Sequence, residues 1–557
     1  MGSTLIFMMV VGAVALTEGS AKHLPFAIAA LLFNAALLLI FVADLDRAIL
    51  LSGLLAIAIA GASTVKFDHS AIKLTISDIP LAFAGTVPFL VLQYPRAMLG
   101  ILIGGVLFVA ASIAVLLYAA GPPISMACRL LLFCVALIGF ATAAAVTGGS
   151  ALSRMALIQR RGFYSTFMAS LVNRVCWQQF SGLALSDIAN EPLPLKEATP
   201  ARSDDCPDII IIQHESVFDP RIFGLPVESI VEGLLSPADG QYGRLNVDIF
   251  GGGSWQSEFS LLTGLSSASF GSSAYYLFKK GAGRFHSSLP HSLASLGYRT
   301  TLISSCRRGF LNYNRFYSSI GIHERIFIDD LPPPFDARRF EATNSDAVFL
   351  EAVIDAHTKR VTDNPAPHFL YALTNFNHGP HDRQLAPTGQ FKKERAFATA
   401  SLPDAGYVEY YTRLAETAST WKKLKYKLAT QFPGRPILIV HYGDHQPVLT
   451  KRIARRLKRR GDAQQAFGTF YAIEALNISP KQFSAGRGAD LDIAFLGTVA
   501  LQRAGLPLDP VFSTRASLLD DCRESYFSSA SERKRRFHRT LVDLGLIDLV
   551  PNVPPAR

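Results

Sequence analysis

Apolar residues are spread unevenly along the chain: long apolar runs fill the first part, and shorter alternating or amphipathic segments fill the rest. The long runs predict membrane-spanning helices, because about 20 mainly apolar residues cross the hydrocarbon core of a bilayer. No Lys or Arg precedes the first run, which favours an uncleaved anchor over a signal peptide. Five spans are expected, at 5–16, 24–42, 48–62, 98–119 and 130–146.

A further apolar stretch, residues 76–93, is interrupted or flanked by polar and rigid residues. Asp78 is costly in hydrocarbon, and Pro80, Pro88 and Pro95 break a continuous helix. We therefore expect an interfacial or re-entrant segment here and not a sixth span.

The transmembrane domain is predicted to cover residues 1–147, and a juxtamembrane connector to cover 148–205. The first half of the connector, RMALIQRRGFYSTFMASLVNRVCWQQF, mixes apolar and basic residues. This pattern is typical of a helix lying at the lipid surface, and equally of an amphipathic helix packed on the next domain. The second half, EPLPLKEATPARSDDCP, is rich in proline and charge, as linkers are.

Beyond the connector, short apolar runs alternate with helical patterns, so residues 206–557 are expected to form one α/β domain. Strands separated by helices favour a mixed, mainly parallel sheet between helices. The predicted strands are 209–213, 300–304, 368–373 and 437–441. The predicted helices include 256–263, 289–296, 408–428 and 493–504.

The net charge of +10 does not require a nucleic-acid partner, because the basic excess is concentrated in short runs. KRIARRLKRR and SERKRRFHR hold much of it. Such runs are usually solvated helix faces, with anionic lipid headgroups as the functional alternative. The six cysteines are scattered and form no CxxC pair, which disfavours a structural zinc site, and disulfides are not implied.

Carboxylates and imidazoles follow the predicted strands closely. Glu215, His378 and the pair Asp444-His445 all come shortly after a strand. In mainly parallel sheets, functional groups gather at the carboxyl ends of the strands. A lone carboxylate at a buried strand end is costly unless it is paired or binds a metal, so a buried salt bridge is the alternative for Glu215. Carboxylate and imidazole together suit zinc or manganese, and suit magnesium less well because magnesium prefers oxygen ligands.

A glycine-rich turn delivers a hydroxyl to the start of a predicted helix. The glycines at 251–253 permit unusual backbone angles and close approach of a substrate, and Ser254 follows them. Free N–H groups of the helix that begins there would face a bound phosphate, and a metal beside Ser254 would make its oxygen a nucleophile. The alternative is that Ser254 only caps the helix, with Ser257 or Glu258 completing the interaction.

Four segments, IIIIQHES, GGGSWQSEFSLLTGL, TNFNHGPH and HYGDHQP, together resemble the sulfatase and alkaline-phosphatase-like superfamily. More narrowly, the chain is similar to the branch of membrane phosphoglycerol transferases and lipoteichoic-acid synthases, in which about five N-terminal spans precede an extracytoplasmic catalytic domain. The resemblance implies a metal site made of Glu215, Ser254, Asp444 and His445. It also implies that Ser254 is the catalytic nucleophile and that His378 binds the transferred headgroup or assists the leaving group.

The chain departs from the pattern of these relatives. The nucleophile of this branch is commonly threonine, and serine keeps the hydroxyl chemistry. Sulfatases mature a Cys or Ser within C/S-x-P-x-R, whereas WQSE follows Ser254 here, which disfavours sulfate-ester hydrolysis. Polymer synthases typically clamp the headgroup with aromatic and arginine residues. RRGFLNYNRFY offers Arg307, Arg308, Asn312, Tyr313 and Arg315 for such a clamp, and Arg307 and Asn312 are the substrate-binding residues predicted here.

The predicted function is that of a metal-dependent membrane phosphoglycerol transferase. Ser254 would attack a phospholipid donor, with phosphatidylglycerol expected, and the phosphoserine-type intermediate would pass its headgroup to a periplasmic or cell-envelope glycan acceptor. One Mn²⁺ or Zn²⁺ ion is the expected cofactor. His378 or His381 could supply acid–base help. The alternative for either is an ordinary surface loop residue in NHGPHD, and a role for His378 is favoured. The alternatives are a phosphoethanolamine transferase acting on lipid A or a glycan, a metal-dependent phosphodiesterase or phosphatase, and a non-enzymatic membrane sensor.

Two lines of reasoning disagree about orientation. Arg154, Arg160 and Arg161 follow the last span, and on the positive-inside rule they would place the C-terminal domain in the cytoplasm. A large glycan acceptor and the family resemblance place it outside. We expect a multi-pass protein of the bacterial inner membrane with its catalytic domain facing the periplasm.

Overall fold

The computed structural model describes most of the chain, namely residues 2–18, 22–70, 72–81, 91, 94–152, 160–173, 183, 185, 187–201, 206–335, 344–458, 465–478 and 483–549. The chain divides into two compact units, Met1–Gln179 and Phe180–Arg557. We call them the membrane unit and the α/β unit. The boundary between them falls inside the predicted connector, 148–205.

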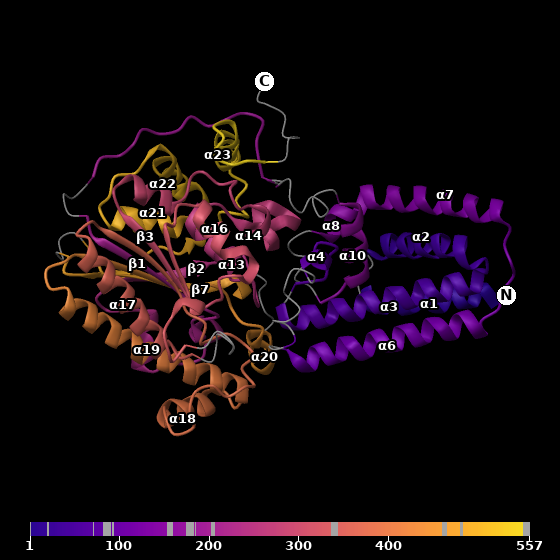
Figure 1. Ribbon diagram of the computed structural model, residues 1–557, viewed down its shortest axis with the longest axis horizontal. Helices are drawn as coiled ribbons and strands as arrows, with labels where there is room; N and C mark the ends of the chain where they lie inside the picture. Colours follow the sequence, from indigo (N-terminus) through magenta and orange to yellow (C-terminus); the bar gives the residue numbers. More distant parts are fainter. Residues whose placement is uncertain are drawn as a thin grey trace. The chain divides into compact units, whose positions relative to one another are not determined.

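Long apolar helices make up the membrane unit (Figure 1). They are α1 (Gly2–Glu18), α2 (Leu24–Val42), α3 (Leu45–Ser70), α6 (Pro95–Tyr118) and α7 (Met126–Ala143), the last continuing through η2 (Ala144–Gly148) into α8 (Gly149–Ala151). Within the described part of the chain, four runs are long and apolar enough to cross a membrane: Leu24–Val42, Leu45–His69, Pro95–Tyr118 and Met126–Ala151.

Two of the predicted membrane segments differ from these four runs. The first expected span, 5–16, is helix α1, whose 17 residues make it shorter than the others. The stretch 76–93 begins with the short helix α4 (Asp78–Leu81), and residues 82–90, 92 and 93 lie outside the described part. Its interfacial or re-entrant placement therefore stays a prediction.

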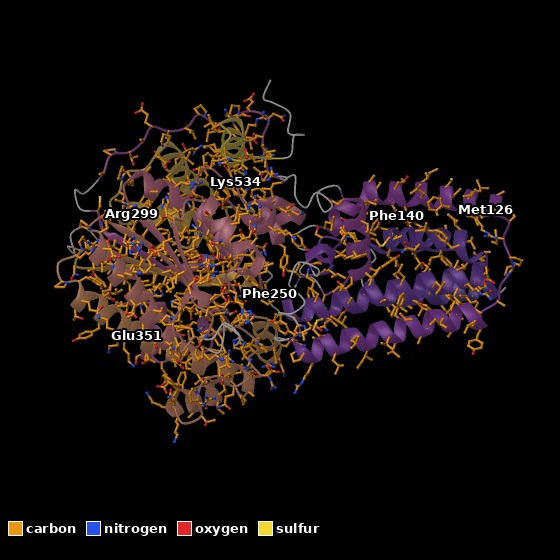
Figure 2. All side chains as sticks on the ribbon, in the orientation of Figure 1. Met126, Phe140, Phe250, Arg299, Glu351 and Lys534 are labelled. Atoms are coloured by element: carbon orange, nitrogen blue, oxygen red, sulfur yellow. The ribbon has the colours of Figure 1, made fainter. Side chains whose placement is uncertain are left out.

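Helices α6 and α7 present apolar side chains outward, as expected for helices that face lipid (Figure 2). No residue of α6 is buried, and Phe140 is the one buried residue of α7. The ring of Phe140 stacks on those of Phe26 and Phe33, with centroids 5.6 and 4.9 Å away. One side of α7 therefore packs on α2 while the remainder is left for lipid.

The first half of the predicted connector belongs to the membrane unit. Helix α10 (Phe163–Val172) is buried along most of its length and packs in one apolar cluster with residues of α2, including Phe26 and Leu31. The buried Glu18 carboxylate accepts the backbone N–H groups of Tyr164 and Ser165 at 3.0 and 3.1 Å, at the start of α10. The described helix thus packs on the membrane helices, which differs from both expected alternatives.

Among the residues that the structure describes, nine strands form one mixed sheet in the α/β unit. Figure 1 shows the central part of this sheet. The strands are β1 (Asp208–His214), β2 (Gln241–Asn246), β3 (Arg299–Ser304), β4 (Glu324–Phe327), β5 (His368–Leu373), β6 (Ile437–Gly443), β7 (Gly468–Leu476), β8 (Gly486–Arg487) and β9 (Leu491–Asp492). The order is β4-β3-β5-β1-β6-β7-β2-β8, with β9 also paired to β2. Strands β4, β3, β5, β1 and β6 are parallel, and β7 is antiparallel to β6 and β2. The predicted mixed, mainly parallel sheet is confirmed.

Helices cover both faces of this sheet. One face packs on α13 (Trp255–Thr263), α15 (Leu289–Ser295), α21 (Ile493–Arg503) and α22 (Pro510–Cys522), and the other on α17 (Asp346–Asp363) and α19 (Ala405–Gln431). The remaining helices are α12 (Ser229–Leu235), α14 (Leu277–Lys280), α16 (Tyr313–Ser319), α18 (Lys392–Ser401), α20 (Leu449–Arg456) and α23 (Glu532–Asp543).

Strand β1 is buried on both faces. Because side chains alternate along a strand, Ile209 and Ile211 enter one core, and Ile210 and Ile212 enter the other. All seven residues of β1 are buried, as is usual for a central strand of a parallel sheet covered by helices. Burial on both faces explains why the sequence of β1 contains a continuous apolar run. Glu215 follows directly after this strand.

The four predicted strands and the four predicted helices are all present, with ends that differ by at most three residues. Strands β2, β4, β7, β8 and β9 were not predicted. Strand β2 (QYGRLN) is mostly polar and half-buried, and β8 and β9 contain two residues each. The run GTFYAIEAL of β7 lacks polar alternation, so its pattern alone does not distinguish a strand from a buried helix.

Candidate active site

Two strand ends lie side by side at the carboxyl edge of the sheet. Strands β1 and β6 are parallel, and His214 is in register with Gly443. The residues that follow them, Glu215 and Asp444, therefore leave the sheet together, and both are buried. His445 comes next and is buried as well.

The turn before α13 brings Ser254 to the same place. Glycines 251–253 have φ values of 82°, 153° and 96°, a backbone region that strongly favours glycine. Ser254 occupies the N-cap position of α13, yet its side chain makes no capping bond. Its hydroxyl instead donates to Oε2 of Glu215 at 2.6 Å and lies 3.4 Å from Nε2 of His445. The capping alternative therefore does not account for this hydroxyl.

We call Glu215, Ser254, Asp444 and His445 the ligand cluster. Nε2 of His445 lies 3.1 Å from Oε1 of Glu215 and 3.6 Å from Oδ2 of Asp444. Glu215, Asp444 and His445 each offer one ligand atom, and these atoms lie within 4.8 Å of one another. Glu215 is thus paired with His445, a residue type that binds metals. In an ordinary buried salt bridge its partner would be a lysine or an arginine.

Ser216, a residue that the sequence motifs did not single out, holds both carboxylates of the cluster. Its φ of 58° is in the left-handed region, which is rare for a non-glycine residue. Its N–H donates to Oδ1 of Asp444 at 2.7 Å, and its hydroxyl donates to Oε1 of Glu215 at 2.8 Å. These two bonds offset the strained backbone. Nothing in the sequence separates this serine from others that follow strands.

The ligand cluster contains two buried carboxylates and one imidazole, so the negative charge of the ionised carboxylates exceeds the positive charge that His445 can supply. Burial acts to raise the pKa of Glu215, but the charge and hydrogen bond of His445 outweigh it and lower the net pKa. Burial and the negative charge of Glu215 raise the pKa of Asp444 well above its usual range. Burial acts to lower the pKa of His445, but the charges of Asp444 and Glu215 raise it to about 9. A cation bound here would relieve the repulsion between the two carboxylates.

The residues present fit a divalent metal. Oδ2 of Asp444 is buried and has no hydrogen-bond partner among the described residues, which is costly for a carboxylate oxygen unless a cation binds it. Carboxylate, hydroxyl and imidazole donors match the preferences of both Mn²⁺ and Zn²⁺. The donor set therefore agrees with the predicted cofactor class without choosing between the two ions.

His378 and His381 lie on the loop after β5, the parallel neighbour of β1, and the structure separates their roles. His381 is buried, with Nε2 2.9 Å from the carbonyl oxygen of Asn377 and its ring against Tyr410, so it has a structural place. His378 is half-exposed, and its charge helps to lower the pKa of Glu215, although burial and His445 have larger effects on that pKa. His378 therefore remains the better candidate for contact with a substrate.

Arg307 and Asn312, the predicted headgroup-binding residues, lie on the segment that follows β3, at the same edge of the sheet. The side-chain amide of Asn312 donates to the carbonyl oxygen of Phe278 at 3.0 Å, and Arg307 is half-exposed. Two other residues of the expected clamp have structural contacts. Arg308 pairs with Asp330 at 2.6 Å, and the buried Tyr313 donates to Glu258 at 3.3 Å. The substrate-binding role of Arg307 and Asn312 stays a prediction.

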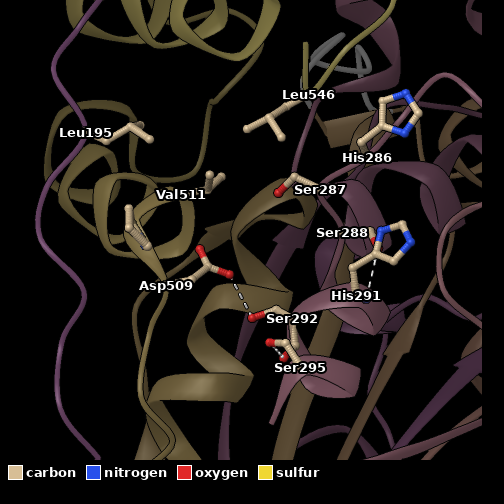
Figure 3. Close-up of a pocket in the computed structure, with 11 residues that line it drawn as sticks. Leu195, His286, Ser287, Ser288, His291, Ser292, Ser295, Asp509, Val511 and Leu546 are labelled. Carbon is tan, nitrogen blue, oxygen red and sulfur yellow. Dashed lines mark hydrogen bonds between the residues drawn. The ribbon is translucent and has the colours of Figure 1, made fainter. Parts of the chain in front are cut away.

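A separate cavity of about 330 Å³ lies between α15 and α22 (Figure 3). Its wall contains several serines, His286, His291 and Asp509. The hydroxyl of Ser292 donates to Asp509 at 2.9 Å, and that of Ser288 donates to the carbonyl of Ile320 at 2.7 Å. These hydroxyls bond to a neighbouring carboxylate and to the backbone, so they join elements of the fold. No residue of the ligand cluster lines this cavity.

The chain is similar to several known proteins. The chain is 24% identical over 317 residues to a Haemophilus influenzae protein of uncharacterised function, which covers 56% of each protein. It is 27% identical over 252 residues to the capsular polysaccharide biosynthesis protein RkpI of Rhizobium meliloti, covering 44% of this chain and 42% of that protein. The chain thus spans about half the length of these relatives.

Solved structures extend the comparison. The lipooligosaccharide phosphoethanolamine transferase EptA of Neisseria meningitidis matches with a TM-score of 0.52 and 12% identity, over 89% of this chain and 95% of that one. The phosphoglycerol transferase GacH of Streptococcus pyogenes matches with a TM-score of 0.47 and 17% identity, over 62% and 86%. The first of these likenesses shows a shared fold of membrane helices followed by an α/β domain.

A family model described as Sulfatase matches residues 207–494, the segment that runs from β1 through β9 and contains the whole ligand cluster. The match covers more than half of the chain and confirms the resemblance that the four sequence segments indicate. The chain belongs to the sulfatase family.

Proposed function

We propose that this protein is a metal-dependent membrane phosphotransferase that moves a glycerophosphate headgroup from a phospholipid to a cell-envelope glycan. The observation that carries the proposal is the hydroxyl of Ser254, which is turned away from its helix and bonded at 2.6 Å to a carboxylate of the ligand cluster. A hydroxyl held in this way is placed to act as a nucleophile.

Each side chain of the ligand cluster has a role in the proposed reaction. Glu215, Asp444, His445 and Ser254 would hold one Mn²⁺ or Zn²⁺ ion, which when bound lowers the pKa of the Ser254 hydroxyl and offsets negative charge on the phosphate. Glu215 also orients the Ser254 hydroxyl, and Ser216 keeps the carboxylates of Glu215 and Asp444 in place. Free N–H groups at the start of α13 would face a phosphate bound at Ser254.

In the first step the Oγ atom of Ser254 attacks the phosphorus of the phospholipid. The Oγ–P bond forms, and the bond from phosphorus to the diacylglycerol oxygen breaks. The Ser254 proton passes to solvent water, because Glu215, whose pKa is lowered, stays ionised to orient the hydroxyl and to hold the metal. His378, half-exposed at the same edge of the sheet, gives a proton to the diacylglycerol oxygen.

In the second step a hydroxyl of the acceptor attacks the same phosphorus. Its proton passes to His378, the Oγ–P bond breaks, and Ser254 takes up a proton from solvent water. The net reaction transfers glycerophosphate and releases diacylglycerol, and both histidine and serine return to their starting states. If water takes the place of the acceptor, the same steps describe a phosphodiesterase.

The sequence around Ser254 supports transfer of a phosphoryl group over hydrolysis of a sulfate ester. Gln256 and Glu258 stand where the sulfatase maturation motif has proline and arginine. Glu258 is buried and bonded to Tyr313 and Tyr317. An arginine at this position would not fit among these tyrosines.

Two further considerations support a lipid donor and a glycan acceptor. Four helices are long and apolar enough to cross a membrane, so the donor would lie in the bilayer that holds the protein. RkpI, a relative at 27% identity, is described as a capsular polysaccharide biosynthesis protein. The location that suits both substrates is the bacterial inner membrane with the α/β unit on the periplasmic side, where envelope glycans are found.

A phosphoethanolamine transferase is the second candidate. It is favoured by the likeness to EptA, which extends over 89% of this chain. The cysteine content weighs on the other side, because such transferases tend to be richer in cysteine. The described cysteines of the α/β unit, Cys206, Cys306 and Cys522, form no disulfide with one another.

The deciding experiment uses purified full-length protein, Mn²⁺ or Zn²⁺, and phosphatidylglycerol labelled in its headgroup, with Ser254→Ala as the matched control. We expect the wild type to release diacylglycerol and to retain label on the protein, and the variant to do neither. Release from phosphatidylethanolamine and not from phosphatidylglycerol would establish the second candidate. Failure with both lipids, when metal is bound, would overturn the donor assignment. Release of free glycerophosphate whether or not a glycan is present would identify a phosphodiesterase.

A further inference from the structure

A fully buried arginine on α19 holds the loop that carries His378. The guanidinium of Arg413 donates through Nη1 to the carbonyl oxygens of Phe376 at 3.3 Å and His378 at 2.9 Å. Through Nη2 it donates to those of Pro380 at 3.5 Å and Arg383 at 2.5 Å. The side chain is 0% exposed, so none of these contacts competes with water.

The fifth donor of the same guanidinium completes an ion pair. Nε of Arg413 donates to Oε1 of Glu409 at 2.9 Å, one helical turn earlier on α19. Glu409 is also buried and accepts the N–H groups of Leu385 and Ala386 at 2.8 and 3.1 Å. All five N–H donors of Arg413 are therefore in use, and the pair holds the loop at both of its ends.

The same face of α19 makes further contacts near the ligand cluster. Residues 410, 413 and 417 follow Glu409 at helical spacing, so they share a side of the helix. The hydroxyl of Tyr410 accepts the N–H of Phe218 at 3.0 Å, just beyond Ser216. Thr417 accepts the side-chain amide of Asn377 at 2.9 Å, next to His378. The helix thus touches both segments that border the cluster.

The loop that Arg413 holds begins beside Glu215. The N–H of Thr374 donates to the carbonyl oxygen of Gln213 at 3.0 Å, where β5 and β1 end together. His378 follows four residues later, and its main-chain oxygen is one of the four that Arg413 binds. A shift of this backbone segment would move the imidazole directly.

We infer that Arg413, paired with Glu409, is a positioning residue that fixes the backbone of the His378 loop so that the imidazole meets the phosphoryl group at Ser254. The inference rests on the proposed function of His378. Arg413 acts through the loop and touches no atom of the ligand cluster. A salt bridge that served only to stabilise the fold could contact the loop at one point. Here Arg413 binds four carbonyl oxygens of the loop and Glu409 binds two of its N–H groups, so the backbone is fixed at six positions.

Lysine cannot replace arginine at this position. An ammonium group has three donors on one atom, while the contacts of Arg413 require five donors in a planar fork. Arg413→Lys keeps the positive charge beside Glu409 but loses the contacts to part of the loop. This variant therefore separates the positioning of the loop from the charge of the pair.

The experiment measures diacylglycerol release by full-length protein in nanodiscs that contain phosphatidylglycerol and phosphatidylethanolamine. Arg413→Lys is made in the wild-type background and in His378→Ala, and hydrogen exchange of residues 374–391 is followed in parallel. Arg435→Lys is the matched control, because Arg435 pairs with Asp208 at the opposite end of β1. Mn²⁺ affinity of each variant is measured by calorimetry.

We expect Arg413→Lys to lower kcat by roughly 10- to 100-fold in the wild-type background, the scale of loss for a catalytic group displaced by about 1 Å. In the His378→Ala background the further loss should be less than about twofold, because the two changes remove the same contribution. Exchange in 374–391 should become faster and Mn²⁺ affinity should stay unchanged. Arg435→Lys should change neither kcat nor exchange in this loop.

Equal losses in the two backgrounds, or unchanged exchange in 374–391, would overturn the inference. The failure of the proposed function has a different signature. In that case wild-type protein releases no diacylglycerol from either lipid while it still binds Mn²⁺. Exchange in 374–391 would then decide whether Arg413 fixes the loop, independently of the donor.

Discussion

The hydroxyl of Ser254 stands at the start of a helix but bonds to a carboxylate from another strand. A helix N-terminus loses a capping bond when its N-cap residue directs its side chain elsewhere, and that loss is worth about 1 kcal/mol. The bond to Glu215 and the binding of a cation would offset it. The Ser254 side chain is therefore placed at the ligand cluster, as a nucleophile would be, and does not stabilise its own helix by capping.

Replacement of Ser254 tests this assignment at one atom. Ser254→Ala removes the nucleophile, and we expect loss of diacylglycerol release by at least about 10³-fold. Ser254→Thr keeps the hydroxyl and should retain release within about tenfold of the wild type. Metal content measured on both variants checks that the site is still loaded. Wild-type rates in Ser254→Ala would show that another group is the nucleophile.

Glu258 is a buried carboxylate below the active site, one turn along α13 from Ser254. It accepts hydrogen bonds from Tyr317, Tyr313 and Gln213. Burial raises its pKa to about 8, although the three hydrogen bonds favour the charged form. The folded protein therefore holds a proton on Glu258 that the unfolded chain releases near its ordinary pKa of 4.5.

The raised pKa of Glu258 makes the stability of the folded protein depend on pH. Between about pH 4.5 and 8 the folded state binds more protons than the unfolded state, so the contribution of Glu258 to stability falls as pH rises through this window. Glu258→Gln, which cannot ionise, should flatten this part of the Tm–pH curve. Thermal unfolding from about pH 5 to 9 measures it. Glu351→Gln, on the outer surface of α17 (Figure 2), is the control and should keep the wild-type curve.

At the scale of elements, the ligand cluster depends on how closely two parallel strands and one turn approach. Gly443, the last residue of β6, faces the turn after β1, and a Cβ atom there would lie 1.8 Å from the carbonyl oxygen of Val217. Backbone atoms cannot yield at such a distance without a shift of the whole turn. Glycine at this position is therefore required by sterics.

Gly443→Ala should displace Asp444 from Ser216 and weaken metal binding as well as folding. We expect Mn²⁺ affinity to fall by at least about tenfold and Tm to drop, with the strain of an overpacked site amounting to about 1–3 kcal/mol. Calorimetry and thermal unfolding measure the two effects. Gly233→Ala on α12, where an added Cβ meets nothing within 4 Å, is the matched control. Unchanged affinity in Gly443→Ala would contradict the steric argument.

At the scale of the whole molecule, a metal held by the ligand cluster, as proposed, would stabilise the folded α/β unit. Its ligands come from the ends of β1 and β6 and from the start of α13, which are far apart in the sequence. The unfolded chain does not hold these groups together, so a metal bound to the folded state stabilises it by mass action.

Removal of metal should lower the unfolding temperature. At a free Mn²⁺ or Zn²⁺ concentration of about 100 times the Kd, the expected stabilisation is about 2.7 kcal/mol. Unfolding of the full chain with EDTA and with added metal measures it. Asp444→Asn should abolish most of the difference. An equal response to metal in this variant would show that the ion binds elsewhere.

Orientation is also a property of the whole molecule. Arg160, one of the arginines after the last span, forms an ion pair with Asp68 at 2.9 Å. In the same unit, Lys66 forms an ion pair with Asp78 at 2.7 Å. These basic residues are thus paired with acidic residues of the membrane unit. We expect a reporter fused after Arg557 to be active when it requires the periplasm and silent when it requires the cytoplasm. The reverse result would overturn the proposed location of the α/β unit.

The sequence by itself determined the main elements and, with the family resemblance, the four residues of the ligand cluster. Long apolar runs have few alternatives to membrane helices, and a buried strand that ends in Glu215 or Asp444 is informative because an isolated buried carboxylate is costly. The four residues of the cluster come from such local signals together with the family resemblance. Their convergence follows from the rule that parallel strands place their carboxyl ends at one edge.

The tertiary structure decided what depends on contacts between distant segments. The left-handed turn at Ser216, the packing of α10 on the membrane helices, and the antiparallel strand β7 have no local signature in the sequence. Glu409 and Arg413 have the spacing of a common surface pair, i and i+4, and only the structure shows that they are buried and bonded to the backbone of the His378 loop. Local patterns reveal propensity and burial, but the partner of a polar group is set only when the chain has folded.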